Sequence, residues 1–354
     1  MFIGSCAGNF YAINKTSGQL QWSYDIRRDG NQQSFHGDPL VTNDLILIGT
    51  DKSCDPNGVG HVYAFERDSG KVRWKYRSTS VPTDIIQLNS NVYFGSFQDN
   101  WSSVDLHTGS LNWSFSTGAP NKDCDMPKPP VTDGHRLFIV GQDGVIYSLN
   151  ALSGRVSWKR KLPATPSTGL ALRDKTIYVG TNDERLYRLN AETGAVISQL
   201  ATEAKPVGRL AFANDSLFLL LQNGSERVGY IISVDSKLTG IRWKQRSSPD
   251  WASERPHLWK DFVVAGNCRG RLAAFRATDG EPQWNLSLEG CIRSIGSSGD
   301  MLFAGVQEGT IYAYELSAKP IRLYKSDFQG TLLLQVRAPP SLAGSSLLFG
   351  RHGK

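Results

Sequence analysis

The sequence predicts an all-β protein, an eight-bladed β-propeller made of four-stranded antiparallel blades. Three observations favour this fold. A short motif recurs eight times along the 354 residues, apolar and polar residues alternate between the copies, and the chain holds 35 Gly, 9 Trp, 12 Tyr and 15 Phe. Alternation of this kind is typical of strands, and turns at such short intervals require the strands to be antiparallel.

The recurring motif is a small residue, a polar residue two positions later, a Ser/Thr-Gly pair and a tryptophan after three further residues. Its first copy runs from Ala12 to Trp22. The turn positions run from residue 18 to residue 319 in seven steps of about 43 residues, a spacing typical of propeller blades. The matching residues are Gly18, Gly70, Gly109, Gly154, Gly194, Gly240 and Gly280, and Trp22, Trp74, Trp113, Trp158, Trp243 and Trp284.

Some later copies depart from the motif. Ser198 stands where the fifth tryptophan is expected, the turn before Gly240 has slipped by one residue, and the eighth copy has Lys319 at the glycine position and Leu323 at the tryptophan position. We interpret the tryptophans as packing residues that fill the wedge between blades and contact the neighbouring turn, because aromatic side chains bury large areas.

Each copy predicts four strands. An apolar run that ends in glycine, such as residues 92–95, is followed by a polar turn, a second strand, the Ser/Thr-Gly turn and the strand with the tryptophan. A fourth strand lies between copies, as at residues 38–42. One such sheet cannot bury both of its faces, whereas eight stacked around an axis can.

We expect residues 1–354 to form a single domain in which strands from both termini close blade 1. An inner strand near residues 336–342 would join the three N-terminal strands. The tail, residues 346–350, repeats the opening of a blade, so the chain is alternatively a fragment of a longer protein.

Composition narrows the function classes. The net charge of +6 comes from scattered residues, so a nucleic-acid surface is not indicated. No run of eighteen apolar residues predicts a transmembrane helix, and the first residues lack the pattern of a secretory signal. The cysteines, at positions 6, 54, 124, 268 and 291, are widely spaced and odd in number. We therefore expect neither a zinc site nor a disulfide framework.

The starts of the inner strands supply the candidate binding residues, because they lie at the mouth of the axial channel. Counting eleven residues back from the strand glycine, or from Leu220 in its place, gives Asp38, Asp84, Arg209 and Arg255. Arg293 and Arg337 lie near the corresponding starts of later blades. Blades two and three would face blades six and seven, so the mouth would have an acidic and a basic side that orient a charged partner or small ligand. The alternative is that these charges pair across the channel.

Two further candidates are weaker. His36 and Asp38 are two residues apart and would form a base with its orienting carboxylate, although the sequence assigns no nucleophile beside them. Residues 51–58 form the most acidic loop, with two carboxylates and one amide, whereas calcium binds six to eight oxygens. We interpret this loop as an inserted surface turn and predict no metal site.

The motif resembles the tryptophan-docking repeat of the PQQ-like propellers, and the resemblance covers essentially the whole chain. This family contains quinoprotein dehydrogenases, which bind pyrroloquinoline quinone and calcium, and non-enzymatic eight-bladed propellers that resemble the envelope lipoprotein of the outer-membrane β-barrel assembly machinery. The chain is more similar to the second group in size and regularity, and it lacks the adjacent cysteines common in the first.

The resemblance implies a non-enzymatic scaffold that binds a protein partner, with no cofactor expected, in the periplasm or cell envelope. Two alternatives remain at this stage. One is a quinoprotein dehydrogenase, and the other is a sensor or ligand-binding module of a multidomain protein.

Overall fold

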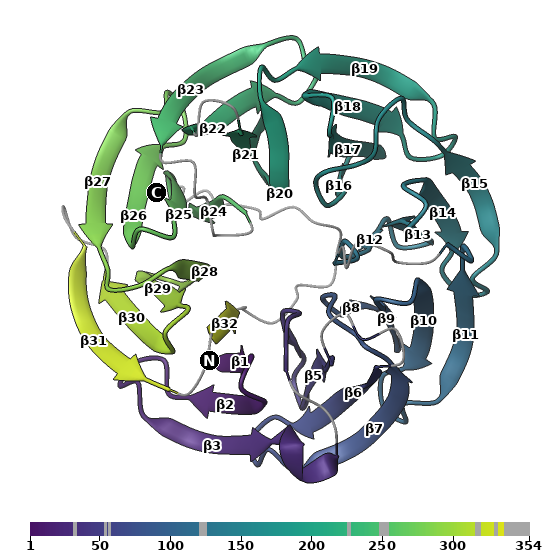
Figure 1. The fold of residues 1–354 in the computed structure, drawn as a ribbon, viewed down its shortest axis with the longest axis vertical. Helices are drawn as coiled ribbons and strands as arrows, with labels where there is room; N and C mark the ends of the chain where they lie inside the picture. The colour runs from purple at the N-terminus through teal and green to yellow at the C-terminus, as the bar shows by residue number, and fades with distance from the viewer. Residues whose placement is uncertain are drawn as a thin grey trace, which may run out of the picture.

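The computed structural model describes residues 1–30, 34–52, 55, 58–119, 126–224, 228–247, 255–315, 320–328 and 332–335. These residues form eight four-stranded antiparallel sheets arranged as blades around one axis. Figure 1 shows the ring in the order of the chain, with the outermost strand of each blade on the rim. This arrangement confirms the predicted fold. In the described ranges, no helix is long and apolar enough to cross a membrane.

Blade 1 contains β1 (Phe2–Ser5), β2 (Asn9–Ile13), β3 (Leu20–Asp25) and β32 (Leu332–Gln335), and blade 2 contains β4 (Leu40–Val41), β5 (Leu45–Gly49), β6 (Val59–Glu66) and β7 (Val72–Thr79). Blade 3 contains β8 (Ile86–Leu88), β9 (Asn91–Gly95), β10 (Asn100–Asp105) and β11 (Leu111–Ser116). Blade 4 contains β12 (Val131–Thr132), β13 (Arg136–Val140), β14 (Ile146–Asn150) and β15 (Val156–Arg160). The 3₁₀ helix η1 (Ile26–Asp29) follows β3.

Blade 5 contains β16 (Ala171–Arg173), β17 (Thr176–Thr181), β18 (Arg185–Asn190) and β19 (Val196–Ala201), and blade 6 contains β20 (Lys205–Ala213), β21 (Ser216–Asn223), β22 (Val228–Asp235) and β23 (Ile241–Ser247). Blade 7 contains β24 (His257–Trp259), β25 (Phe262–Gly266), β26 (Arg271–Arg276) and β27 (Pro282–Ser287). Blade 8 contains β28 (Ile292–Ser298), β29 (Met301–Val306), β30 (Thr310–Glu315) and β31 (Ile321–Asp327).

Blade 1 joins the two ends of the described chain. β32 pairs antiparallel with β1, with Leu334 opposite Ile3 and Gln335 opposite Phe2. The expected inner strand at residues 336–342 lies outside the described residues, and the strand that pairs with β1 begins earlier, at Leu332. Only residues 328–331 separate β31 from β32, so the strand that pairs with β1 precedes the segment where we expected it.

The polar residue of the motif holds the turn between the two outermost strands of a blade, such as β2 and β3 in blade 1. In blade 1, Asn14 Oδ1 accepts hydrogen bonds from the backbone N–H groups of Thr16 and Ser17, at 2.9 and 3.0 Å. Asp105 accepts the equivalent pair from His107 and Thr108 in blade 3. Such side-chain bonds replace missing backbone partners and fix a tight turn. The repeat therefore specifies the same turn in successive blades.

Five of the six motif tryptophans, all but Trp284, pack on a turn glycine of the next blade. A Cβ built on Gly70 would lie 2.6 Å from the ring of Trp22, and Trp22 Nε1 donates to the carbonyl oxygen of Arg67 at 3.1 Å. The same contact joins Trp74 to Gly109, Trp113 to Gly154, Trp158 to Gly194 and Trp243 to Gly280.

The eighth copy, which departs from the motif, makes this contact with a tyrosine. Tyr324 occupies the strand position opposite Ala313 that tryptophans hold in other blades, and its ring lies against Gly18. Its hydroxyl donates to the carbonyl oxygen of Lys15 at 2.9 Å, which joins blade 8 to blade 1. Leu323 was therefore the wrong residue for this position, because the eighth copy contains one residue more between the small residue and the aromatic one.

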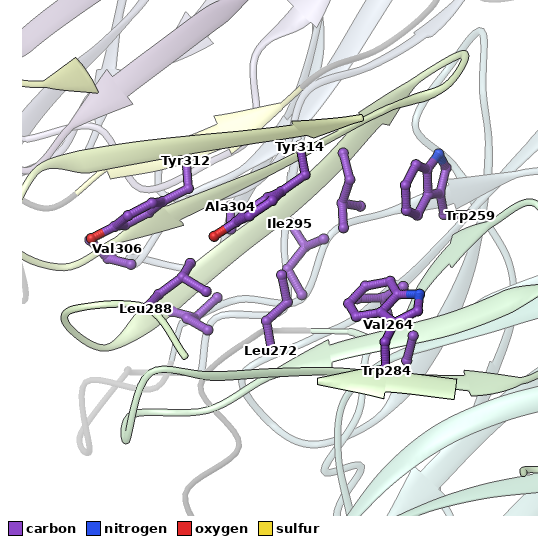
Figure 2. Packing of buried hydrophobic residues seen from close by; sticks show 13 residues of the cluster. Trp259, Val264, Leu272, Trp284, Leu288, Ile295, Ala304, Val306, Tyr312 and Tyr314 are labelled. Atoms are coloured by element: carbon purple, nitrogen blue, oxygen red, sulfur yellow. The ribbon is translucent and has the colours of Figure 1, made fainter. Parts of the chain in front are cut away.

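The hydrophobic core lies between the blades. Figure 2 shows the cluster between blades 7 and 8, where Trp259 and Trp284 lie on one side of Leu272 and Tyr312 and Tyr314 on the other. The two indole rings meet edge to face at 6.3 Å. Both faces of a blade are covered in this way, which leaves the turns and the strand starts to carry polar contacts.

Candidate functional site

One face of the ring carries the connections that enter the inner strands, and we call it the entry face. Because the strands are antiparallel, the turns between the two middle strands of each blade, such as β1 and β2 or β5 and β6, lie on this face as well. The Ser/Thr-Gly turns lie on the opposite face. Five of the six candidate binding residues predicted from the sequence, all but Arg337, lie in the described ranges, and these five belong to the entry face.

Four charged side chains from the entry face meet near the ring axis, and we call them the axial cluster. They are Asp38 before β4, Asp84 before β8, Arg209 on β20 and Arg255 before β24. The Arg209 guanidinium forms a bidentate ion pair with Asp84, in which the Nη2–Oδ1 distance is 3.1 Å. Arg209 and Arg255 also lie 3.6 and 3.8 Å from Asp38.

The ion pairs of the axial cluster cross the ring. Asp84 precedes β8 of blade 3, whereas Arg209 belongs to β20 of blade 6, and these strands lie on opposite sides of the axis (Figure 1). Of the two arrangements considered for these residues, the structure contains the one in which the charges pair across the axis. The four residues therefore tie opposite blades together.

Burial and ion pairing shift the pKa of Asp84 in opposite directions, and its side chain is only 7% exposed. Burial alone would raise its pKa, but the charge and hydrogen bonds of Arg209 outweigh burial, with help from the Asp38 N–H and the Arg255 charge, and they lower the pKa of Asp84. Asp84 is accordingly a carboxylate at neutral pH, held by an ion pair that two opposite blades share.

Local backbone features position this cluster. The pairing of β20 with β21 shifts register between Val207 and Ala211, and Gly208 within this bulge has a φ of 71°. A bulge redirects a side chain, and here it contains Arg209. On the other side, a Cβ on Gly37 would lie 2.3 Å from the carbonyl oxygen of Thr83. Only glycine allows the two carboxylate-bearing segments to approach this closely.

The two remaining candidates at the strand starts differ. Arg293 is exposed and lies at a register shift of β28, between Ile292 and Ser294. It forms no ion pair within the part of the chain that the structure describes. Arg337 lies outside the described residues. Arg293 is thus a second exposed cation, beside the one-third exposed Arg255, on the entry face.

The cysteines depart from the sequence expectation. Cys268, in the turn after β25, forms a disulfide with Cys291, just before β28. The sequence favoured no disulfide framework, and the described residues contain this single bridge. It forms because the turn of one blade touches the connection into the next, although 23 residues separate the two cysteines. Cys54 and Cys124 lie outside the described residues.

His36 is held by a different carboxylate from the one expected. Its Nδ1 lies 2.5 Å from Asp51 Oδ2, whereas Asp38 turns to the axis. The expectation failed because residues 36 and 38 precede β4, so the alternation of a strand does not apply to them. Cys6 lies on the other side of the ring of His36.

Cys6 and Asp51 were not predicted to belong to one site. A usable signal existed, since each lies two residues after the glycine of an apolar run, Gly4 or Gly49. Residues at the same turn position of successive blades are neighbours on the entry face. Comparison of that register position would have placed Cys6, Asp51 and Cys268 in equivalent turns.

The described residues near the axis do not fit a calcium-bound quinone. Calcium requires six to eight oxygen ligands. The two axial carboxylates, Asp38 and Asp84, are already paired with arginines, whose charge repels a divalent cation. Across the described ranges, no group of three or more His, Cys, Asp or Glu side chains is arranged to hold a metal ion.

Comparison with known protein families matches this chain twice to the family described as outer membrane protein assembly factor BamB, over residues 1–200 and over residues 104–322. The chain belongs to this family. The BamB match confirms the resemblance to the PQQ-like propellers that the motif indicated.

Curated BamB proteins are similar to this chain at modest identity. The Legionella pneumophila protein is 22% identical over 199 residues, 52% of this chain and 48% of the relative. The Moranella endobia protein is 22% identical over 357 residues, 96% of this chain and 79% of the relative. The chain thus spans about half the length of some curated relatives that it matches. The quinone-dependent alcohol dehydrogenase subunit of Gluconacetobacter polyoxogenes is 25% identical over 40% of this chain and 21% of that subunit.

Solved structures share the fold. BamB from Moraxella catarrhalis superimposes with a TM-score of 0.71 at 16% identity and covers 90% of this chain and 91% of that one. A europium-containing methanol dehydrogenase superimposes with a TM-score of 0.62 at 12% identity, over 89% of this chain and 80% of that one. Because one architecture carries a BamB protein and an enzyme, the fold does not decide the function.

Proposed function

We propose that this chain is a non-enzymatic scaffold that binds a protein partner during the assembly of outer-membrane proteins. The observation that carries the proposal is the pair of BamB family matches, which together span residues 1–322. The axial cluster supports the non-enzymatic part, because its carboxylates are engaged by arginines and do not offer ligands to a quinone and calcium site.

The entry face near the axis is the proposed docking surface. The carboxylates of Asp38 and Asp84 are 19% and 7% exposed, whereas Arg255 is 34% exposed and Arg293 is exposed as well. Within the axial cluster the negative charges are therefore the more buried ones, and the charge that the cluster presents to a partner is positive. Such a surface attracts an acidic segment and speeds its encounter.

The compartment proposed for this scaffold is the periplasmic side of the cell envelope. The BamB relatives are named for outer-membrane assembly, which takes place there. The Cys268–Cys291 disulfide supports the same compartment, because disulfides persist in oxidising environments such as the periplasm and are rare in the cytosol.

Deletion of the gene in its own host tests the proposal. We expect the amount of folded outer-membrane protein to fall and to be restored by the wild-type gene. Restoration by a variant that combines Arg255→Ala and Arg293→Ala should be incomplete, whereas Arg155→Ala, at an exposed arginine on the opposite face, should restore fully. Unchanged outer-membrane protein after deletion would contradict the assembly role. Full restoration by the double variant would contradict only the docking surface.

A further inference from the structure

Three side chains of the entry face meet between blades 1 and 2, away from the axial cluster, and we call them the Cys6 triad. Cys6 lies in the turn between β1 and β2, His36 in the segment between η1 and β4, and Asp51 in the connection after β5. They come from three separate connections, so the fold of two neighbouring blades brings them together.

The triad forms a continuous chain of contacts. Cys6 Sγ lies 3.5 Å from His36 Nε2, and His36 Nδ1 lies 2.5 Å from Asp51 Oδ2. The second carboxylate oxygen, Asp51 Oδ1, accepts a hydrogen bond of 2.9 Å from Ser34 Oγ. The backbone fixes the carboxylate as well, because Ser34 and Asp51 exchange both of their N–H···O bonds, at 3.0 and 3.2 Å. A thiol, an imidazole and an orienting carboxylate in this order form the arrangement that activates a cysteine.

The charges of the triad favour an imidazolium beside the sulfur. Burial alone would lower the pKa of His36, but hydrogen bonds and charge interactions with Asp51 and Cys6 outweigh burial and raise it to about 10. His36 is therefore a cation at neutral pH. A cationic histidine next to a cysteine stabilises the thiolate, which is the nucleophilic form of that residue.

The sulfur is within reach of a reagent in solution. Cys6 is the one unbridged cysteine in the portion of the chain that the structure describes, and it is partly exposed. The side chain of His36 is 28% exposed, whereas that of Asp51 is fully buried. The carboxylate is thus enclosed while the reacting end of the triad faces outward.

The neighbouring backbone argues against acyl transfer. That reaction requires N–H donors aimed at the oxyanion that develops next to the nucleophile. The two N–H groups that follow Cys6 are already used, since Ala7 N donates to Ser5 Oγ at 3.1 Å and Gly8 N donates to the Ser5 carbonyl at 3.0 Å. Attack on a disulfide needs only a thiolate and access to it.

The same two positions carry reactive groups in another pair of neighbouring blades. Cys268 lies two residues after Gly266, as Cys6 does after Gly4, and Cys291 stands in the connection into the next blade, as His36 does. Between blades 7 and 8 the two positions carry a disulfide. Between blades 1 and 2 the second sulfur is replaced by an imidazole, which leaves Cys6 available for reaction with an external sulfur.

We propose that Cys6 is a nucleophilic thiolate that undergoes thiol–disulfide exchange with an external disulfide. The thiolate of Cys6 attacks one sulfur of the disulfide and forms a new S–S bond to it. The original S–S bond breaks, and the leaving sulfur departs with the electron pair as a thiolate. The external disulfide is the oxidant, so Cys6 becomes oxidised as the leaving thiol is reduced. This site is independent of the scaffold function proposed above.

Oxidised glutathione serves as the probe, with the full chain, between pH 6 and pH 8. The rate at which the Cys6 peptide gains one glutathione is measured by mass spectrometry, which separates Cys6 from Cys54 and Cys124. We expect the wild-type rate to change little over this range. In His36→Asn the rate at pH 6 should fall about tenfold or more and should rise with pH, as the thiolate fraction of an ordinary cysteine with a pKa near 8.5 does. His107→Asn, at an exposed histidine on the opposite face, should match the wild type.

The pH dependence of the wild-type rate tests the proposal even if His36→Asn does not fold. A wild-type rate that rises about tenfold per pH unit would overturn it, because Cys6 would then behave as an ordinary thiol. Equal profiles for the wild type and a folded His36→Asn variant would overturn it as well. Absence of any glutathione on Cys6 throughout this range would show that disulfides do not reach the sulfur, which also refutes the proposal.

Discussion

The indole of Trp113 lies flat against Gly154, in the turn of the next blade. A Cβ added to Gly154 would lie 2.6 Å from the indole ring, and Trp113 Nε1 donates to the carbonyl oxygen of Ala151 in the same turn at 2.9 Å. Gly154 has a φ of 68°, which side chains disfavour. The glycine and the tryptophan of successive repeats therefore form one contact, and the ring depends on both.

The missing tryptophan of blade 5 provides a comparison for this contact, at a turn glycine that also lacks the positive φ of Gly154. Gly240 would receive such an indole, but Ser198 stands in its place and nothing lies within 4 Å of a Cβ on Gly240. We expect Gly154→Ala to lower the free energy of unfolding by about 1–3 kcal/mol through overpacking and strain, and Gly240→Ala to change it by less than about 0.5 kcal/mol. Urea denaturation measures both. Equal losses would show that neither the indole contact nor the positive φ is what requires glycine at position 154.

Removal of the Arg209 cation from the axial cluster should destabilise the ring. Arg209→Met leaves the buried Asp84 without its bidentate partner, which typically costs about 3–5 kcal/mol. The free energy of unfolding of Arg209→Met is compared with that of Arg155→Met on the opposite face, for which we expect a change below about 0.5 kcal/mol. Similar values for the two variants would refute the stabilising role of the axial pair.

The same variant has a predictable pH dependence. Asp84 has a lowered pKa in the folded protein, so its contribution to stability is present above the ordinary carboxyl value of 3.8 and is lost as the pH falls through the folded value. Arg209→Met removes the cause of the lowered pKa. The stability difference between wild type and variant should therefore narrow as the pH falls below about 4. A constant difference down to pH 2.5 would contradict this cause.

His257 should weaken the fold in mild acid. Burial, with a smaller contribution from the Arg255 charge, lowers the pKa of His257 from 6.5 to about 3, and its Nε2 lies 2.8 Å from Ser297 Oγ of blade 8. The unfolded chain gains a proton near pH 6.5 and the folded chain only near pH 3, so stability falls as the pH drops between these values. Because the imidazole of His257 is only partly buried, we expect the free energy of unfolding to fall by at most about 2 kcal/mol between pH 7 and pH 5. His257→Gln should show a smaller loss by urea denaturation, and parallel curves would contradict the assignment.

The Cys268–Cys291 bridge should stabilise blades 7 and 8. A loop closed over 23 residues corresponds to roughly 3 kcal/mol by the loss of chain entropy in the unfolded state. A double variant, Cys268→Ser with Cys291→Ser, should lose about this amount in urea denaturation. Mass spectrometry of the non-reduced wild type should find the two peptides linked. Unlinked peptides would contradict the bridge directly.

The repeat predicted the fold because its information is local and periodic. The turn around Asn14 and the docking of Trp22 on Gly70 follow from residue types at fixed spacing, and spacing is visible in a sequence. The eighth copy was misread by one residue, at Leu323 instead of Tyr324, because strand pairing, and not the count, decides which side chain faces the next blade.

The site was predicted less completely. Asp38, Asp84, Arg209 and Arg255 were found by register, because every inner strand starts at the axis, but their pairing across the ring depends on side-chain reach and on the bulge at Gly208. The Cys6 triad and the disulfide are contacts between turns of adjacent blades. Such contacts depend on how one blade stacks on the next, which a motif within a single blade does not encode.

The docking of a protein partner at the entry face is tested most directly by photo-crosslinking in living cells. A photoreactive amino acid replaces Arg293 near the axis or, as the control, Arg155 on the opposite face. The account predicts that position 293 forms a crosslink to a distinct protein of the outer-membrane assembly machinery and that position 155 does not. Crosslinks from position 155 alone, or from neither position in a correctly folded and exported protein, would contradict it.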